Sequence, residues 1–165
     1  MLKQIEGNLL DGFDNGEINV MAAVNNLDHK MGKGIALQIA KRYPKAVVAD
    51  NETAKGDVCK LGSFSTAEIE RGKFIINLYA QIGIGNNGDP LNRNFCYDHF
   101  YNSLYRLKDR ILKYKAKKPD WTPVIGLPYK VGCGLAGGNW YITKKIIQEV
   151  FESSGFSVLI YQLPS

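Results

Sequence analysis

The stretch INVMAAVNNLDHKMGKGIALQIAKRY, residues 18–43, indicates the fold class, because it passes from a strand pattern to a helix pattern across a glycine loop. Ile18 to Val24 is mostly apolar, and its composition and length predict a buried strand. Ile35 to Tyr43 predicts a helix that is stopped by Pro44. A strand that leads through a loop into a helix is the building unit of layered α/β folds.

The same alternation extends to both ends of the chain and predicts a layered α/β fold with a central sheet. No internal repeat or linker interrupts the 165 residues, so we expect a single domain over residues 1–165. Further strands are expected at 2–6, 57–64, 73–81, 123–127 and 157–163. Further helices are expected at 44–53, around Phe100, Leu104, Leu107 and Ile111, and around Ile146, Ile147, Val150 and Phe151, with a loop at 82–94.

The composition is that of a globular protein without a membrane segment. Apolar residues make up 45% and charged residues 22% of the chain. No apolar run approaches the roughly 20 residues of a membrane span, and the N-terminus does not resemble a signal peptide. We therefore expect a cytoplasmic location and no membrane partner. The three widely separated cysteines form no C-x-x-C pair, which argues against a zinc site or a disulfide framework.

The net charge of +5 allows attraction to polyanions, and the densest basic run is Lys113 to Lys118. This run lies where a helix should end before Pro119, and cations there favour the negative end of the helix dipole. A single-stranded RNA binder would need stacking aromatic residues beside the run, and Tyr114 alone is weak support. The sequence therefore argues against nucleic acid as a partner.

The first glycine loop, residues 25–36, predicts an anion-binding turn. Glycine lets the backbone approach a ligand closely, and successive N–H groups at a helix start can bind an anion. The loop is neither a Walker A motif nor a Rossmann G-x-G-x-x-G motif, where Leu37 would have to be glycine. Asn26 and His29 can reach a sugar next to the phosphate. The alternative is a strand-to-helix turn without a ligand.

The second glycine loop, Gly132 to Gly138, has four glycines in seven residues. An ordinary connection needs one or two, because each glycine loses much backbone entropy on folding. This loop therefore favours a ligand cradle more strongly than the first. Cys133 is expected to be a small packing residue rather than a nucleophile, since no histidine lies near it in sequence.

Together, M-G-x-G-I-A and, about a hundred residues later, G-C-G-L-x-G-G-x-W resemble the macrodomain family. The similarity is closest to the branch with ADP-ribose-1″-phosphate phosphatases and the terminal ADP-ribose protein glycohydrolase. It covers nearly the whole chain, including Gly7-Asn8-Leu9-Leu10, Leu78-Tyr79-Ala80-Gln81 and the closing stretch 158–163. The resemblance implies a three-layer α/β/α fold with a central mixed sheet, and ADP-ribose as the ligand.

The resemblance also implies roles for individual residues. Asn26 falls where the family places an asparagine against the distal ribose. Asn8, beside Leu9, replaces the usual aspartate that accepts from the adenine amino group. Apart from the resemblance, Tyr97 and Tyr161 are aromatic residues that can flank the nucleoside, and packing in the core or at the surface is the alternative for each. The diphosphate would lie between two sets of residues, Gly32, Lys33, Gly34 and Ile35 on one side and Gly132, Cys133, Gly134, Leu135, Ala136 and Gly137 on the other.

Two departures from the family pattern bear on the chemistry. The glycohydrolase of this branch uses a lysine and an aspartate where this chain has Gln81 and Ala136. Glutamine cannot form the covalent sugar adduct, and alanine cannot carry a proton. That mechanism is therefore not expected here.

The remaining hypothesis is a phosphatase that converts ADP-ribose-1″-phosphate to ADP-ribose and phosphate, with Asn26 orienting the ribose and His29 delivering water. It needs no metal and no cofactor. One alternative is a non-catalytic module that binds ADP-ribose or ADP-ribosylated macromolecules. Another is a hydrolase of a different ADP-ribose linkage.

Overall fold

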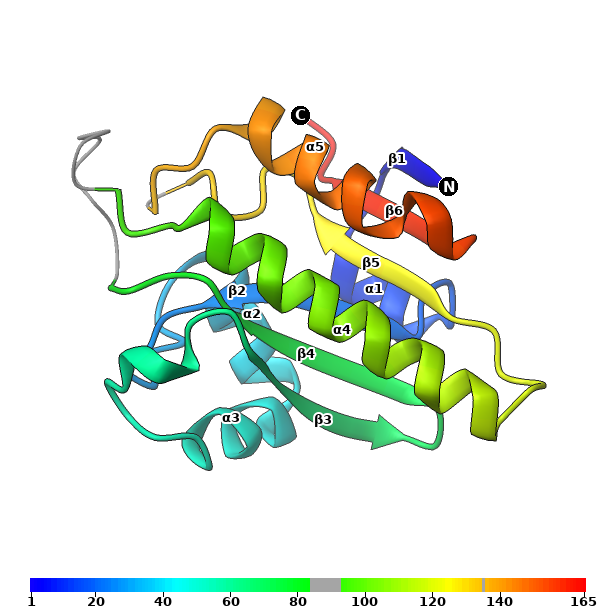
Figure 1. Cartoon of the computed structure of the whole chain (residues 1–165), viewed down its shortest axis with the longest axis horizontal. Helices are drawn as coiled ribbons and strands as arrows, with labels where there is room; N and C mark the ends of the chain where they lie inside the picture. The colour runs from blue at the N-terminus through cyan, green and yellow to red at the C-terminus, as the bar shows by residue number, and fades with distance from the viewer. Residues whose placement is uncertain (84–92, 135) are drawn as a thin grey trace.

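A six-stranded sheet forms the centre of the computed structural model, which describes residues 1–83, 93–134 and 136–165 (Figure 1). The strand order is β1-β6-β5-β2-β4-β3, and all neighbours are parallel except β3, which runs antiparallel to β4 at one edge. The strands are β1 (Leu2–Glu6), β2 (Val20–Asn25), β3 (Phe64–Glu70), β4 (Lys73–Tyr79), β5 (Val124–Pro128) and β6 (Ser157–Gln162).

Helices cover both faces of this sheet, and each face has its own apolar core. In Figure 1, α4 and α5 lie in front of the sheet, and α1, α2 and α3 lie behind it. The expected three-layer α/β/α fold with a central mixed sheet is confirmed. The helices are α1 (Leu9–Asp14), α2 (Gly34–Arg42), α3 (Pro44–Asn51), α4 (Tyr97–Lys117) and α5 (Trp140–Phe151).

Strand β2 lies between β5 and β4, and all six of its residues are buried. A strand covered on both faces reads as a continuous apolar run, which is why the predicted strand at 18–24 is correct. Its side chains alternate between the two cores: Val24 packs on the α4 and α5 side, and Ala23 packs on the side of α1, α2 and α3.

The structure differs from the sequence-based expectations in one strand and one helix. The expected strand at 57–64 is wrong, because the Asp57 side chain accepts the N–H of Cys59 and starts a short 3-10 helix, Val58–Lys60. The strand in this region begins only at Phe64. Helix α1 was not predicted, and it begins where the Asn8 side chain accepts the N–H groups of the first turn. Of the expected loop at 82–94, residues 84–92 lie outside the described part of the chain.

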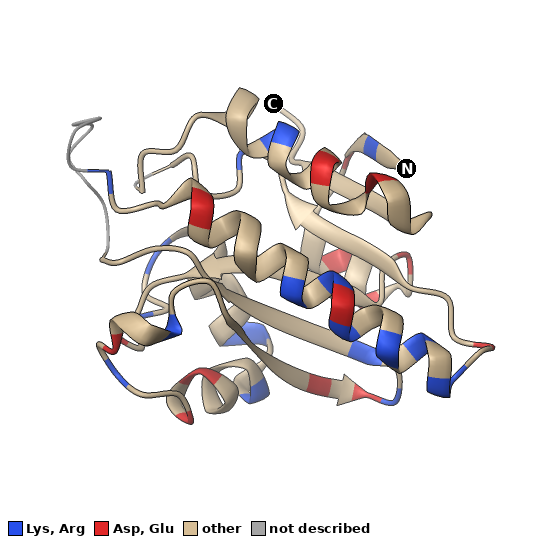
Figure 2. Cartoon of the chain, in the orientation of Figure 1, with Lys and Arg blue, Asp and Glu red and all other residues tan. Residues whose placement is uncertain are grey.

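The basic run of the sequence is the C-terminal end of α4, as expected from Pro119. Figure 2 shows that the Lys and Arg positions of α4 are concentrated in its C-terminal half. There the Lys115 ammonium donates to the Trp121 carbonyl at 2.9 Å, and Lys113 pairs with Asp109. At 1.5 Å per residue, this end lies about 30 Å from the start of the helix. Within the described ranges, no helix combines the length and apolarity needed to cross a bilayer.

Candidate functional site

A cavity of about 390 Å³ opens at the carboxyl ends of β2 and β5, where the two glycine loops leave the sheet. Ligands of α/β sheets bind at this edge, and the volume falls within the roughly 300–1,000 Å³ of small-molecule sites. The described residues that line it are Val24, Asn25, Asn26, Lys30, Lys33, Gly34, Ile35, Ala36, Gln81, Pro128, Tyr129, Lys130, Val131, Gly132, Gly134 and Ala136.

The lining is positively charged. Lys30 and Lys33 come from the first loop, and Lys130 lies two residues before the second, whereas none of the described lining residues is an aspartate or a glutamate. Three cations around one concave surface attract an anionic ligand. Lys130 and its neighbour Tyr129 also line the cavity, and neither was predicted as a site residue from the sequence.

Asn26 shapes the first loop. Its Oδ1 accepts the N–H groups of Asp28 at 2.9 Å and Lys30 at 3.3 Å, and its Nδ2 donates to the Lys30 carbonyl at 2.7 Å. These bonds fold the chain back on itself directly after β2 and keep Asn26 buried at the cavity wall. The predicted contact of Asn26 with a ribose stays a prediction.

His29 is not among the residues that line the cavity. It has a left-handed φ of 57°, and its Nε2 lies 3.2 Å from Oγ1 of Thr53, which follows α3. The Thr53 hydroxyl donates its single proton to the Asp50 carbonyl at 2.6 Å, so Nε2 of His29 must be the donor in their hydrogen bond. Nδ1 is therefore the nitrogen of His29 left to accept a proton.

Lys60 forms hydrogen bonds that hold the first loop in place. It was not predicted as a site residue from the sequence. Its ammonium donates to the Leu27 carbonyl at 3.0 Å and to Thr53 Oγ1 at 2.9 Å, and it lies 4.7 Å from the ring centre of Tyr79. The side chain is buried. Burial lowers the pKa of this ammonium below its ordinary value of 10.5, and the carboxylate of Asp50 opposes that shift in part.

The start of α2 forms part of the cavity wall. Lys33 is the N-cap residue, and its side chain makes no capping hydrogen bond. The first N–H groups of the helix are therefore free of a side-chain acceptor and can bind an anion. Gly34 has φ 58°, a conformation that glycine adopts without steric cost. Lys33, Gly34 and Ile35 line the cavity, whereas Gly32, predicted with them, does not.

The glycines of the second loop fall into two groups. Gly132 has φ 74°, and a Cβ there would lie 2.7 Å from Cζ of Phe95. A Cβ at Gly138 would lie 2.6 Å from the Gly132 carbonyl oxygen. These two glycines allow the loop to pack on a buried ring. Gly132 and Gly134 both line the cavity, but a Cβ at Gly134 meets no heavy atom within 4 Å.

The remaining predicted residues of this loop have different surroundings. Cys133 lies outside the cavity lining, with its Sγ near the Val131 carbonyl and Thr143 Oγ1, and burial raises the pKa of its thiol. A packing role fits this environment. Gly137 closes a turn by donating its N–H to the Gly134 carbonyl. Leu135 lies outside the described residues.

Gln81 and Ala136 both line the cavity, at the positions where the resemblance places a lysine and an aspartate. The Gln81 amide donates to the Gly83 carbonyl, and the Ala136 carbonyl accepts the N–H of Phe95. Neither side chain is an ionisable group. The lysine and aspartate chemistry of the glycohydrolase therefore has no counterpart at these two positions.

A second cavity of about 380 Å³ adjoins the first. The two share Ile35, Pro128 and Tyr129, so they lie side by side. The predicted nucleoside residues line the second cavity: Asn8, Leu9 and Tyr161.

Two of these residues are already hydrogen-bonded within the chain. The Oδ1 of Asn8 accepts the N–H of Leu10 at 2.9 Å, as part of the α1 cap. The Tyr161 hydroxyl donates to Glu17 at 3.1 Å, and burial raises the pKa of this phenol.

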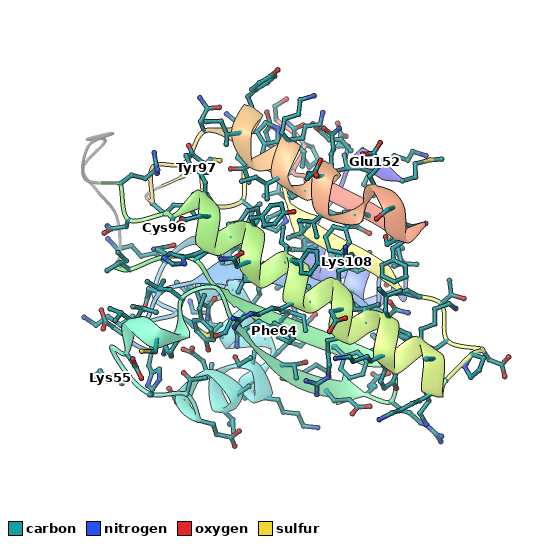
Figure 3. All side chains as sticks on the ribbon, viewed as in Figure 1. Lys55, Phe64, Cys96, Tyr97, Lys108 and Glu152 are labelled. Atoms are coloured by element: carbon teal, nitrogen blue, oxygen red, sulfur yellow. The ribbon has the colours of Figure 1, made fainter. Side chains whose placement is uncertain are left out.

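Tyr97, the other tyrosine considered for the nucleoside, lines neither cavity. It lies at the first turn of α4 beside the second loop (Figure 3). Its hydroxyl accepts the N–H of Asn139 at 2.8 Å, and its ring packs edge-on against Phe95. Tyr97 therefore braces the second loop from the outside.

Asn25, the last residue of β2, lines the cavity and was not singled out from the sequence. It is 4% exposed, and neither atom of its side-chain amide has a hydrogen-bond partner among the described residues. Such an amide is costly, because the water it loses on burial is not replaced. Asn25 was not predicted as a site residue, because the resemblance assigns a role only to its neighbour Asn26.

The chain is 32% identical over 155 residues to an uncharacterized 17.5 kDa protein from the tk-vs intergenic region of Enterobacteria phage T4, covering 89% of this chain and 88% of the relative. No family model matches the sequence.

Solved structures extend the comparison. A Bacteroides thetaiotaomicron protein of unknown function has a TM-score of 0.79 at 23% identity, with 98% of this chain and 97% of that chain covered. The macrodomain of Mycobacterium tuberculosis DarG has a TM-score of 0.73 at 20% identity, with 100% and 99% covered. Thermosipho africanus DarTG in complex with ADP-ribose has a TM-score of 0.67 at 19% identity, with 99% of this chain and 41% of that chain covered.

The macrodomain resemblance seen in the two glycine loops is confirmed by these structures at the level of the fold. The sequence relative is similar over nearly the whole of both chains. This chain therefore has the macrodomain fold and belongs to one protein family with the 17.5 kDa protein of phage T4.

Proposed function

We propose that this protein binds ADP-ribose in the groove formed by the two adjoining cavities. The observation that carries the proposal is their arrangement: one cavity is surrounded by Lys30, Lys33 and Lys130, and the other is lined by Asn8, Leu9 and Tyr161. The first suits a diphosphate and the second suits a nucleoside. A protein of the same fold has been solved in complex with ADP-ribose, which supports this choice of ligand.

In this proposal the diphosphate lies between the start of α2 and the second loop. The uncapped N–H groups after Lys33 would bind one phosphate, and the backbone around Gly134 would face the other. The adenosine would extend past Ile35 and Tyr129, which both cavities share. The terminal ribose would then lie toward Gln81, at the opposite end of the first cavity.

Calorimetry with ADP-ribose tests the proposal directly. We expect saturable binding, and a Gly134→Val variant, which adds a branched side chain to a residue of the cavity lining, should bind at least tenfold more weakly. Lys41→Val serves as the control, since this exposed residue in the last turn of α2 is outside both cavities. Absence of binding by the wild-type protein at millimolar ADP-ribose would overturn the proposal.

The finer proposal is hydrolysis of ADP-ribose-1″-phosphate. Water would attack the terminal phosphorus, the bond from phosphorus to the 1″ oxygen would break, and the products would be ADP-ribose and inorganic phosphate. Lysines and backbone N–H groups around the cavity can stabilise the charge of that transition state. Nδ1 of His29 would accept the proton only after the side chain moves to the cavity.

A binding module without turnover is the alternative, and a specific observation favours it. The His29 imidazole is bonded to Thr53 outside the cavity lining, and no described lining residue is a carboxylate or a histidine. Phosphate release from ADP-ribose-1″-phosphate separates the two. The phosphatase predicts release that falls at least a hundredfold in His29→Ala; the module predicts binding without release.

A further inference from the structure

The side-chain amide of Asn8 is hydrogen-bonded within the chain through its oxygen alone. Asn8 caps α1, and its Oδ1 accepts the N–H of Leu10 at 2.9 Å and the N–H of Asp11 at 3.2 Å. Only an oxygen can accept from a backbone N–H, so the cap determines which atom of this amide is the oxygen. An amide oxygen has two lone pairs, and the cap uses both.

The nitrogen of the same amide is within reach of a ligand. Asn8 lines the second cavity and is half-buried, and its Nδ2 donates to no described residue. In the described ranges, the side-chain atoms that are both buried and unpartnered all belong to Asn25, so Nδ2 of Asn8 is accessible. Asn8 therefore offers a ligand two N–H donors and no acceptor.

The other side chains of this cavity do not replace the missing acceptor. None of its described lining residues is an aspartate or a glutamate. The Tyr161 side chain is buried, and its hydroxyl is already bonded to Glu17. Gln38 and Gln162 are exposed, and an amide that can rotate offers its donor or its acceptor equally well. Asn8 is thus the lining amide whose orientation is fixed by the fold.

A fixed donor discriminates between purine bases at position 6 of the ring. Adenine has an amino group there, which donates, whereas a 6-oxopurine such as guanine or hypoxanthine has a carbonyl oxygen, which accepts. Asn8 Nδ2 can form a hydrogen bond with the carbonyl oxygen. It cannot form one with the amino group, and two donors that face each other lose their water without compensation.

We infer that the second cavity prefers a 6-oxopurine base to adenine, and that Asn8 determines this preference. The inference rests on the proposed function, because it takes from it the nucleoside position beside Asn8. The ligand class of the groove is then the purine nucleoside diphosphate riboses with a carbonyl at position 6. ADP-ribose binds in the same groove and more weakly.

Calorimetry with ADP-ribose and IDP-ribose, which carries hypoxanthine in place of adenine, tests this inference. We expect wild type to bind IDP-ribose about two- to tenfold more tightly than ADP-ribose, the effect of one hydrogen bond. Asn8→Asp should reverse the order. Aspartate also caps a helix, and its second oxygen accepts from the adenine amino group and repels a carbonyl. Asn8→Ser keeps a capping oxygen without the amide nitrogen, so it should bind the two ligands equally.

The ratio of the two affinities within each variant is the deciding quantity, because a change in charge near the diphosphate affects both ligands alike. Asn15→Asp makes the same chemical change at the exposed opposite end of α1, outside both cavities, and should keep the wild-type ratio. A wild-type preference for IDP-ribose below about twofold, or an unchanged ratio in Asn8→Asp, would overturn the inference. Failure of the proposed function differs, because wild type would then bind neither ligand.

Discussion

The two glycine loops are similar in composition and differ in what holds them in place. The first loop is held by polar groups, since Asn26 bonds three backbone atoms within it and the buried Lys60 ammonium bonds it from below. The second loop is held by an apolar ring, because Gly132 and Gly138 pack closely on Phe95. A glycine-rich sequence can therefore be needed for close packing of the backbone as well as for contact with a ligand.

The largest expected effect on stability comes from a second-loop glycine that is required for close packing. Gly132→Ala should lower the free energy of unfolding by about 2–4 kcal/mol, because the new Cβ overlaps the ring of Phe95 in a left-handed conformation. Gly134→Ala is the matched control and should change stability by less than about 0.5 kcal/mol. Urea denaturation measures both. Equal losses in the two variants would mean that close packing on Phe95 does not require glycine at position 132.

The glycines of the second loop also show which features can be predicted from the sequence and which cannot. The strand at 18–24, the helix after Gly34 and the two loops at one sheet edge follow from local composition and period, and these predictions proved correct. The packing of Phe95 under Gly132 joins residues 37 positions apart, and local patterns do not encode such contacts. Glycine content alone therefore overstated the ligand-contacting part of the second loop.

The buried polar residues were missed for a related reason. Lys60 and Asn25 are single polar residues without a motif, and their surroundings exist only after folding. Lys60 lies within the segment 57–64 that was wrongly predicted as a strand, so its burial could not be read from strand alternation. Helix α1 escaped prediction because it has six residues and includes Gly12, so no helical period develops.

The next effect concerns the polar support of the first loop. Lys60→Met should lower the free energy of unfolding by about 1–2 kcal/mol, because two charge-assisted hydrogen bonds are lost while the stem still packs. Amide hydrogen exchange at Asp28 should become faster as the loop loosens. Lys55→Met, at an exposed lysine of the same segment, is the control. If exchange at Asp28 stayed as slow as in wild type, Lys60 would not support the loop.

A smaller effect tests whether one ligand is held by both loops. Lys33→Met and Lys130→Met each remove one cation from the cavity, and each should weaken ADP-ribose binding by about 0.5–1 kcal/mol, or two- to fivefold. The losses should add in the double variant and shrink at high ionic strength, because salt screens exposed charges. Calorimetry at two salt concentrations measures this. A ligand that contacted one loop alone would make one of the two single variants indistinguishable from wild type.

The smallest effect comes from the protonation of Lys60 itself. Burial lowers its pKa in the folded protein below 10.5, so between the folded pKa and 10.5 the unfolded chain holds more protons than the folded chain. Stability rises with pH wherever the unfolded state binds more protons. The unfolding free energy of wild type should therefore increase relative to that of Lys60→Met as the pH approaches 10.5. At lower pH, where the amine is charged in both states, the difference should be constant. The hydroxyls of Tyr43 and Tyr161 bond to Asp14 and Glu17 and not to Lys60, so their titration is common to both proteins and cancels in this subtraction. A stability difference that stayed constant, or that shrank for wild type as the pH rose, would mean that the Lys60 ammonium is as well solvated as that of a surface lysine. The first loop would then not be held by a buried polar group, and the contrast with the second loop, which packs on the ring of Phe95, would fail.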